Sequence, residues 1–206
     1  MVSSTGARVA AFTLRPRHTD EERKETHKYI VPGTGDAEGV VPEAWFSADD
    51  DGLKEFLTWE GGLDWLIITL PLTPQTTSLV GKTELELLSK STNNKTDTGA
   101  GAFITNISRG KILDQASLLH HLKLFEDTQG REGLRGAALD VTEPEPLPEG
   151  DELWDAPNLV MSAHVSGESE GYVGRALRVF EVNYGREARG VGVEGWVNVV
   201  DRGRGY

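Results

Sequence analysis

Gly136-Ala-Ala-Leu-Asp-Val-Thr-Glu-Pro-Glu-Pro-Leu-Pro148 is the stretch that decides the fold. Its apolar half ends at Asp140, and a loop of glutamates and prolines follows. A buried strand that delivers a charge at its carboxyl end is typical of open α/β sheets, which bind ligands there. Arg109-Gly110 and His164 also come directly after apolar runs. We therefore expect these three places to lie together at one edge of a parallel sheet.

Strands and helices are predicted to alternate on both sides of this stretch. The expected strands are residues 7–14, 64–70, 102–107, 134–141 and 158–162. The expected helices are residues 19–28, 49–57, 82–90, 114–125 and 168–189, with a polar loop at 91–101. This alternation predicts βαβ units and a parallel sheet with right-handed crossovers. The near-continuous apolar run at 64–70 is typical of a strand that is covered on both faces.

The composition limits the partners of the chain. A formal net charge of -12 over 206 residues argues against nucleic acid or an anionic membrane, because both need a basic face. There is no cysteine, which is consistent with a reducing compartment. No run of 18 apolar residues and no signal segment is found, so we expect a cytoplasmic protein.

His164 is the histidine best placed for chemistry, because it follows a predicted buried strand. A histidine in this position can also be merely structural or exposed. A general acid that acts near neutral pH needs an imidazole whose pKa is held up by a carboxylate, and the acidic loop after Asp140 can supply one. His120 and His121 are adjacent and point to different sides of a helix, so no metal site is expected there.

Arg109-Gly110 allows two interpretations. It is either an ordinary turn or a turn that presents a guanidinium, whose fixed geometry holds a substrate carboxylate in a bidentate manner. An acid, a carboxylate that orients it and an arginine clamp together suit hydride transfer to or from a 2-oxo or 2-hydroxy acid. The hydride itself requires a nicotinamide cofactor.

Five motifs carry a family resemblance, and together they cover residues 64–188. They are Leu70-Pro-Leu-Thr-Pro-Gln-Thr-Thr77, Ile104-Thr-Asn-Ile-Ser-Arg-Gly110, Ala138-Leu-Asp-Val-Thr-Glu-Pro-Glu-Pro-Leu-Pro148, Pro157-Asn-Leu-Val160 and Ala163-His-Val-Ser-Gly167. In order and spacing they resemble the signatures of the D-isomer-specific 2-hydroxyacid dehydrogenases. The tail, Val197-Asn-Val-Val-Asp-Arg-Gly-Arg-Gly-Tyr206, resembles the end of the glyoxylate/hydroxypyruvate reductase-like members.

The resemblance implies the roles of three catalytic residues. Arg109 would bind the carboxylate and carbonyl of a small 2-oxo acid, and His164 would donate the proton during reduction. Glu145 would be the carboxylate partner of His164. Glu143 is the rival for that role, and only the spacing of the family favours Glu145.

The resemblance also implies cofactor contacts. Asp140 would approach the nicotinamide carboxamide, with Ile107 and Ser166 near the nicotinamide, whereas Pro71 and Thr76 would line the adenosine and phosphate side. Arg15 and Arg17 follow the first predicted strand, where an acid usually meets the ribose of NAD and arginine favours the 2′-phosphate of NADP. We therefore expect NADP, with NAD as the alternative, unless the two arginines only form a solvated loop. A homodimer is also implied.

The resemblance exposes one difference. The family's G-x-G-x-x-G turn should precede the strand at 7–14, but it is not there; Gly33 to Gly39 is one residue too long, and Gly190 to Gly195 follows a helix. The expected fold is an incomplete Rossmann-like α/β domain at residues 1–188, with a tail at 189–206 that returns to an absent substrate lobe. The chain alone is expected to bind little cofactor. The alternative is a non-catalytic remnant or binding module.

Overall fold

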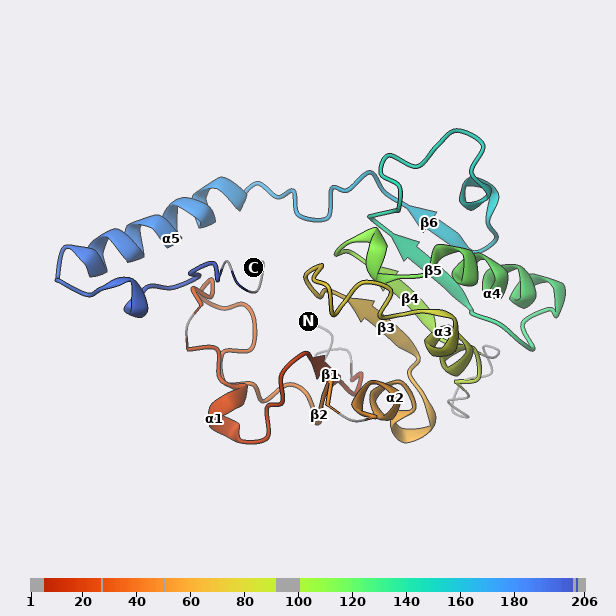
Figure 1. Cartoon of the computed structure of the whole chain (residues 1–206), viewed down its shortest axis with the longest axis horizontal. Coiled ribbons are helices and arrows are strands. Elements are labelled where there is room, and N and C mark those ends of the chain that lie inside the picture. Colours follow the sequence, from red (N-terminus) through yellow and green to blue (C-terminus); the bar gives the residue numbers. More distant parts are fainter. Residues whose placement is uncertain (1–5, 27, 50, 92–100, 202, 204–206) are drawn as a thin grey trace. The chain divides into compact units, whose positions relative to one another are not determined.

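The computed structural model describes residues 6–26, 28–49, 51–91, 101–201 and 203 (Figure 1). The chain forms two compact units, one from residues 57–166 and the other from residues 1–56 together with 167–206. Most of the polar loop predicted at 91–101 and the last residues of the tail lie outside the described residues. The division into a domain at 1–188 and a tail at 189–206 stays a prediction.

A four-stranded parallel sheet forms the centre of the unit at residues 57–166. Its strands are β3 (Trp65–Ile68), β4 (Phe103–Asn106), β5 (Gly136–Leu139) and β6 (Leu159–Met161), in that spatial order. Leu66, Ile104, Ala137 and Leu159 are paired in register across it. Helices α3 (Lys82–Ser89) and α4 (Gln115–Asp127) connect the first three strands. The predicted Rossmann-like α/β fold with parallel strands is confirmed.

The core of this unit lies on one face of the sheet. Leu85, Leu88, Leu118, Leu122 and Ile104 have no exposed surface. Helix α4 begins where it does because the Asp114 side chain accepts a hydrogen bond from the Ser117 amide at 3.1 Å, which satisfies a free N–H of the first turn.

Within this unit, the other face of the same sheet carries exposed apolar side chains. The exposed fractions of Trp65, Ile67 and Val160 are 52%, 38% and 68%, and burial alternates along β3. Within this unit, β3 is covered on one face only, whereas the sequence predicted cover on both faces. An apolar run shows that a strand is suited to burial. Whether its second face is covered depends on which other elements of the fold pack against it.

The second unit contains a short parallel pair, β1 (Ala10–Thr13) and β2 (Ala44–Ser47). Strand β2 is not among the predicted strands. Helix α2 (Gly52–Leu57) follows it, and Phe56 packs between the rings of Phe12 and Phe46, with centroid distances of 5.7 and 5.8 Å. The helix predicted at 19–28 is only the single turn α1 (Asp20–Arg23), closed by a capping box between Thr19 and Glu22.

The long helix α5 (Tyr172–Glu187) belongs to this unit too, and none of its residues is buried. Asn183 ties it to the tail, because its side chain donates to the Val197 carbonyl at 3.0 Å and accepts from the Val197 amide at 2.8 Å. Short 3₁₀ turns complete the chain at Trp59–Gly61, Gly110–Ile112, Glu152–Asp155 and Val193–Gly195. In the part of the chain that the structure describes, every helix is too short or too polar to traverse a lipid bilayer.

His121 is a buried titratable group in α4, with an exposed fraction of 5%. Its Nδ1 has no hydrogen-bond partner among the described residues. Burial, and after it the charge of the neighbouring His120, lowers the pKa of His121. In α3 and at its C-cap, the charge of Glu86 raises the pKa of His121, whereas the charges of Lys82 and Lys90 lower it. The fold therefore favours the neutral imidazole.

Replacing His121 with leucine is expected to reduce the loss of stability on acidification. Because the pKa of His121 is lower in the folded chain than the ordinary value of about 6.5, the neutral side chain makes its full contribution to the free energy of unfolding above that pH. Below it the unfolded chain binds the proton first, so stability falls as the pH falls towards the folded pKa. Urea unfolding at pH 7 and pH 5 measures this, with His18→Gln, an exposed histidine outside α4, as the control. An equal loss in His121→Leu and the parent chain would contradict the prediction.

Candidate active site at the carboxyl ends of the strands

The loops after β4, β5 and β6 are joined by backbone hydrogen bonds. The Asp140 amide donates to the Asn106 carbonyl at 3.0 Å, and the His164 amide donates to the Asp140 carbonyl at 2.9 Å. Because parallel strands end at the same edge of the sheet, these contacts bring the Arg109, Asp140 and His164 loops side by side. The clustering expected from the sequence is confirmed.

The side chains of His164 and Glu145 form a hydrogen bond in this cluster. His164 Nδ1 lies 2.6 Å from Glu145 Oε1. The two side chains are 44% and 38% exposed, so the pair faces solvent and is accessible to a ligand. The Nδ1 contact leaves Nε2 as the nitrogen that can exchange a proton with a bound molecule.

Glu143 has a different partner. Its carboxylate lies 3.6 Å from Lys111 Nζ, and its backbone amide and carbonyl both bond the Gln115 side chain. Of the two glutamates that the sequence left in competition, Glu145 is therefore the one that contacts His164.

Asn106 shapes the turn that carries Arg109. The Asn106 side chain is 1% exposed, donates to the Arg109 carbonyl at 3.0 Å and accepts from the Ser108 amide and hydroxyl. Arg109 itself is exposed, and its Nη1 donates to the Ser108 carbonyl at 2.6 Å. Sequence reasoning missed Asn106; the signal was a carboxamide at the end of an apolar strand, where a buried polar group needs partners.

Gly110 explains why the arginine is followed by glycine. A Cβ at this position would lie 2.1 Å from the Thr142 carbonyl oxygen and 2.2 Å from its carbon. The contact is with backbone, which cannot rotate away. Glycine therefore lets the Arg109 turn approach the loop that begins at Asp140.

Replacing Gly110 with alanine is expected to destabilise the chain by about 1–3 kcal/mol or more, as overpacking does. The clash would also move Arg109 away from the His164 loop. Gly167→Ala is the matched control, because a Cβ there meets nothing within 4 Å. Urea unfolding of both variants measures the difference, and equal midpoints would contradict this account of Gly110.

The residues predicted near the nicotinamide belong to the same edge. Ile107 is 42% exposed and follows β4, and Ser166 is exposed and follows β6. Asp140 is 4% exposed, and its carboxylate accepts hydrogen bonds from the His164 loop. The structure thus places Asp140 and Ser166 in the loops beside His164 and Ile107 at the same edge of the sheet, whereas their contact with a cofactor stays a prediction.

The loop after β3 carries Pro71 and Thr76. The Thr76 hydroxyl donates to the Pro71 carbonyl at 2.7 Å and accepts from the Thr73 amide at 2.7 Å. Thr76 has no exposed surface, whereas Pro71 is partly exposed. A contribution of Thr76 to a cofactor site would therefore come through the shape of this loop.

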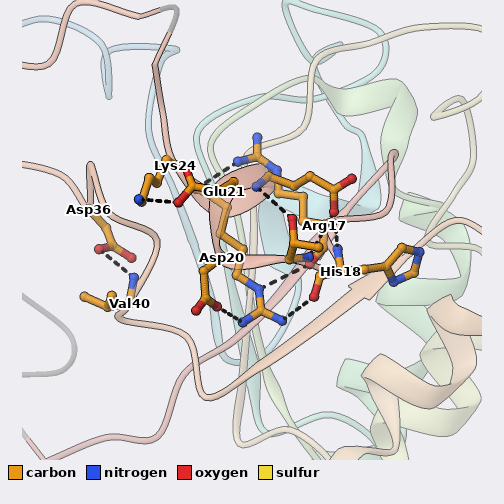
Figure 2. A network of polar contacts seen from close by, with 10 residues as sticks. Arg17, His18, Asp20, Glu21, Lys24, Asp36 and Val40 are labelled. Atoms are coloured by element: carbon orange, nitrogen blue, oxygen red, sulfur yellow. Dashed lines mark hydrogen bonds and ion pairs between the residues drawn. The ribbon is translucent and has the colours of Figure 1, made fainter.

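Arg15 and Arg17 lie in the other unit, after β1, and they differ in their surroundings. Arg17 Nη2 bonds Glu25 Oε1 at 2.9 Å, and Nη1 donates to the Arg23 carbonyl at 3.2 Å. Figure 2 shows Arg17 in the polar network around α1. Its guanidinium also lies 5.6 Å from the centre of the Trp45 ring. Arg15 is exposed. Of the two, Arg15 has the side chain that reaches solvent more freely.

Neither glycine-rich stretch forms the phosphate-binding turn of a dinucleotide site. The stretch from Gly33 to Gly39 is followed by β2, and the one from Gly190 to Gly195 ends in a 3₁₀ turn. A pyrophosphate site of this kind needs a glycine turn that opens a helix. These two stretches therefore do not fit the pyrophosphate of a dinucleotide.

Comparison with known proteins identifies the family. The model of the D-isomer specific 2-hydroxyacid dehydrogenase NAD binding domain matches residues 47–166. Glycerate dehydrogenase from Methylorubrum extorquens is 34% identical over 122 residues, which is 58% of this chain and 33% of that protein. Glyoxylate/hydroxypyruvate reductase A from Salmonella choleraesuis is 33% identical over 144 residues, 68% of this chain and 38% of the reductase. The chain thus matches about a third of the length of these relatives.

Solved structures agree with this result. A D-isomer specific 2-hydroxyacid dehydrogenase from Xanthobacter autotrophicus, in complex with NADPH and MES, superposes with a TM-score of 0.66 and 26% identity, covering 100% of this chain and 65% of the other. An NADPH-dependent glyoxylate/hydroxypyruvate reductase from Sinorhizobium meliloti, with NADP and sulfate, gives 0.65 and 25%, covering 100% and 51%. With its family model matched over more than half of its residues, this chain belongs to the D-isomer specific 2-hydroxyacid dehydrogenases.

Proposed function

We propose that the chain acts in an oxidoreductase that transfers hydride between NADPH and a small 2-oxo acid, with glyoxylate or hydroxypyruvate as the favoured substrates. The observation that carries the proposal is the 2.6 Å contact between His164 and Glu145, at the sheet edge that also holds Arg109. Family membership and the names of the relatives support it. We also propose a cytoplasmic location and a homodimer. Light scattering would test the homodimer.

The chemistry divides among three side chains. NADPH, when bound, supplies the hydride that reduces C2 of the 2-oxo acid. Arg109 would hold the substrate carboxylate with two parallel N–H donors and polarise the neighbouring carbonyl. His164, protonated on both nitrogens, would donate the Nε2 proton to the carbonyl oxygen as it becomes a hydroxyl. Glu145 orients the ring through Nδ1 and stabilises the imidazolium before that transfer.

The activity is best tested in a hybrid protein and in the 206-residue chain in parallel. In the hybrid, the part of the Salmonella choleraesuis reductase that precedes its matched segment is followed by this chain. We expect the hybrid to oxidise NADPH in the presence of glyoxylate or hydroxypyruvate, and the chain alone to be far less active. A hybrid that is folded but does not respond to either acid would favour the alternative, a non-catalytic remnant or binding module.

NADPH is expected to be the preferred cofactor of the hybrid, and Arg15 is expected to provide most of that preference. One charge-assisted hydrogen bond to the 2′-phosphate contributes about 1.5–3 kcal/mol, so Arg15→Ala should raise the KM for NADPH about 10- to 100-fold and leave that for NADH unchanged. Arg17→Ala should have the smaller effect, because Glu25 already binds this guanidinium. A faster rate with NADH in the parent hybrid would contradict the assignment of both arginines.

A further inference from the structure

The Asp140 carboxylate accepts three hydrogen bonds from the loop around His164. Its Oδ1 accepts from the Ser162 hydroxyl at 2.6 Å and from the Val165 amide at 2.9 Å. Its Oδ2 accepts from the Ser166 amide at 2.9 Å. The donors come from both sides of His164, whose own amide bonds the Asp140 carbonyl. Asp140 therefore holds the His164 loop at four points.

The backbone of His164 explains why such a restraint is needed. Its φ angle is 56°, in the left-handed region that residues with a Cβ seldom adopt. A residue stays there only when its surroundings impose the conformation. In the described structure, the Asp140 carboxylate bonds Ser162 before His164 and Val165 and Ser166 after it.

The charge state of Asp140 suits this task. Burial by itself would raise the pKa of its carboxyl group, but the hydrogen bonds from Ser162, Ser166 and Val165 outweigh burial and hold the pKa far below its ordinary value. Asp140 thus remains a carboxylate, which only accepts hydrogen bonds, at every pH at which the reaction is of interest.

We propose that Asp140 is a positioning residue, which holds His164 in the left-handed conformation that lets Nδ1 reach Glu145. The proposal rests on the proposed function for the importance of His164, but its geometry is independent of any substrate. It assigns Asp140 a role beyond the nicotinamide contact implied by the resemblance. A carboxylate, and not a carboxamide, is required, because the three groups that bond the Asp140 side chain are all hydrogen-bond donors.

The test is an NMR comparison of the isotope-labelled 206-residue chain with its Asp140→Asn variant. The carboxamide of this variant would place an NH₂ group against one of the three donors. We expect the Val165 and Ser166 amide protons to move upfield and the His164 Nδ1 proton shared with Glu145 to be lost. Signals of Leu118 in α4 should be unchanged. Retention of the parent signals at residues 164–166 would overturn the proposal.

Three further variants separate the possible causes. Glu145→Gln should abolish the shared imidazole proton but leave the Val165 and Ser166 amides unchanged, because it acts only on the ring. Asp155→Asn removes an exposed carboxylate from the connection between β5 and β6 and should change none of these signals. Ser162→Ala removes one donor and should shift the Val165 and Ser166 amides less than Asp140→Asn does. If Asp140→Asn does not fold, unchanged amides in Ser162→Ala would overturn the proposal.

Kinetics of the hybrid provide a second readout that a cofactor contact would not mimic. Misplacement of a catalytic group by about 1 Å can lower the rate about 100-fold, so Asp140→Asn should lower kcat by that order. A raised KM for NADPH with unchanged kcat would instead make Asp140 a cofactor ligand and overturn the proposal. A hybrid without any activity would disprove the proposed function and leave the NMR result valid.

Discussion

Replacing His164 with glutamine is expected to lower kcat for glyoxylate reduction in the hybrid about 100- to 10,000-fold, the usual contribution of a positioned general acid. Glutamine preserves the approximate size and a hydrogen-bonding group but has no transferable proton near neutral pH. Because Nδ1 already contacts Glu145, the lost group is the Nε2 proton that would reach the carbonyl oxygen. Steady-state rates at saturating NADPH measure the effect.

Glu145→Gln and His120→Gln are the companions of this variant. Glu145→Gln retains the His164 ring but removes the negative charge that stabilises its protonated form. The kcat of this variant should therefore lie between those of the parent and His164→Gln. His120→Gln removes an exposed imidazole from α4 and should have the parent rate. A His164→Gln variant with the full rate would exclude the proposed mechanism.

Replacing Arg109 with alanine is expected to lower kcat/KM for the 2-oxo acid about 30- to 4,000-fold, which corresponds to the 2–5 kcal/mol lost when one member of a hydrogen-bonded charge pair is removed. The substrate carboxylate would lose its partner, and its carbonyl would lose the polarising charge. Arg109→Lys should recover only part of the loss, since a lysine cannot form two parallel hydrogen bonds. Rates at varied glyoxylate concentrations measure both variants.

Lys111 offers a matched control for Arg109, because it is a cation in the same turn. Its Nζ is paired with Glu143 at 3.6 Å, so Lys111→Ala should leave kcat/KM close to that of the parent. Equal losses in Arg109→Ala and Lys111→Ala would show that the turn needs only positive charge and would contradict a bidentate clamp.

The elements that the sequence predicted well are those whose local signals agree. The apolar runs at 102–107 and 134–141 became β4 and β5, and Asp114 caps α4 as a helix start signal predicts. Strand β2 was missed because Ala44–Ser47 has only two large apolar residues, Trp45 and Phe46, and lacks the longer apolar run that marks the predicted strands. Pairing with β1 creates it, and pairing is a tertiary event.

The sequence alone also determined which kinds of side chain stand at the ends of the strands. Arg109, Asp140 and His164 were expected at one edge because parallel strands end together, and this depends only on strand order and direction. The motif spacing of the family further selected Glu145 over Glu143.

Only the tertiary structure decided which atoms meet. It paired His164 with Glu145 and Glu143 with Lys111, and it showed that the Asp140 carboxylate binds the loop around His164. It also showed that Gly110 is needed for the approach of the Thr142 backbone. The physical reason is that periodicity and local propensity act over a few residues, whereas these contacts join segments about 20 to 30 positions apart and depend on how the strands bring their loops together.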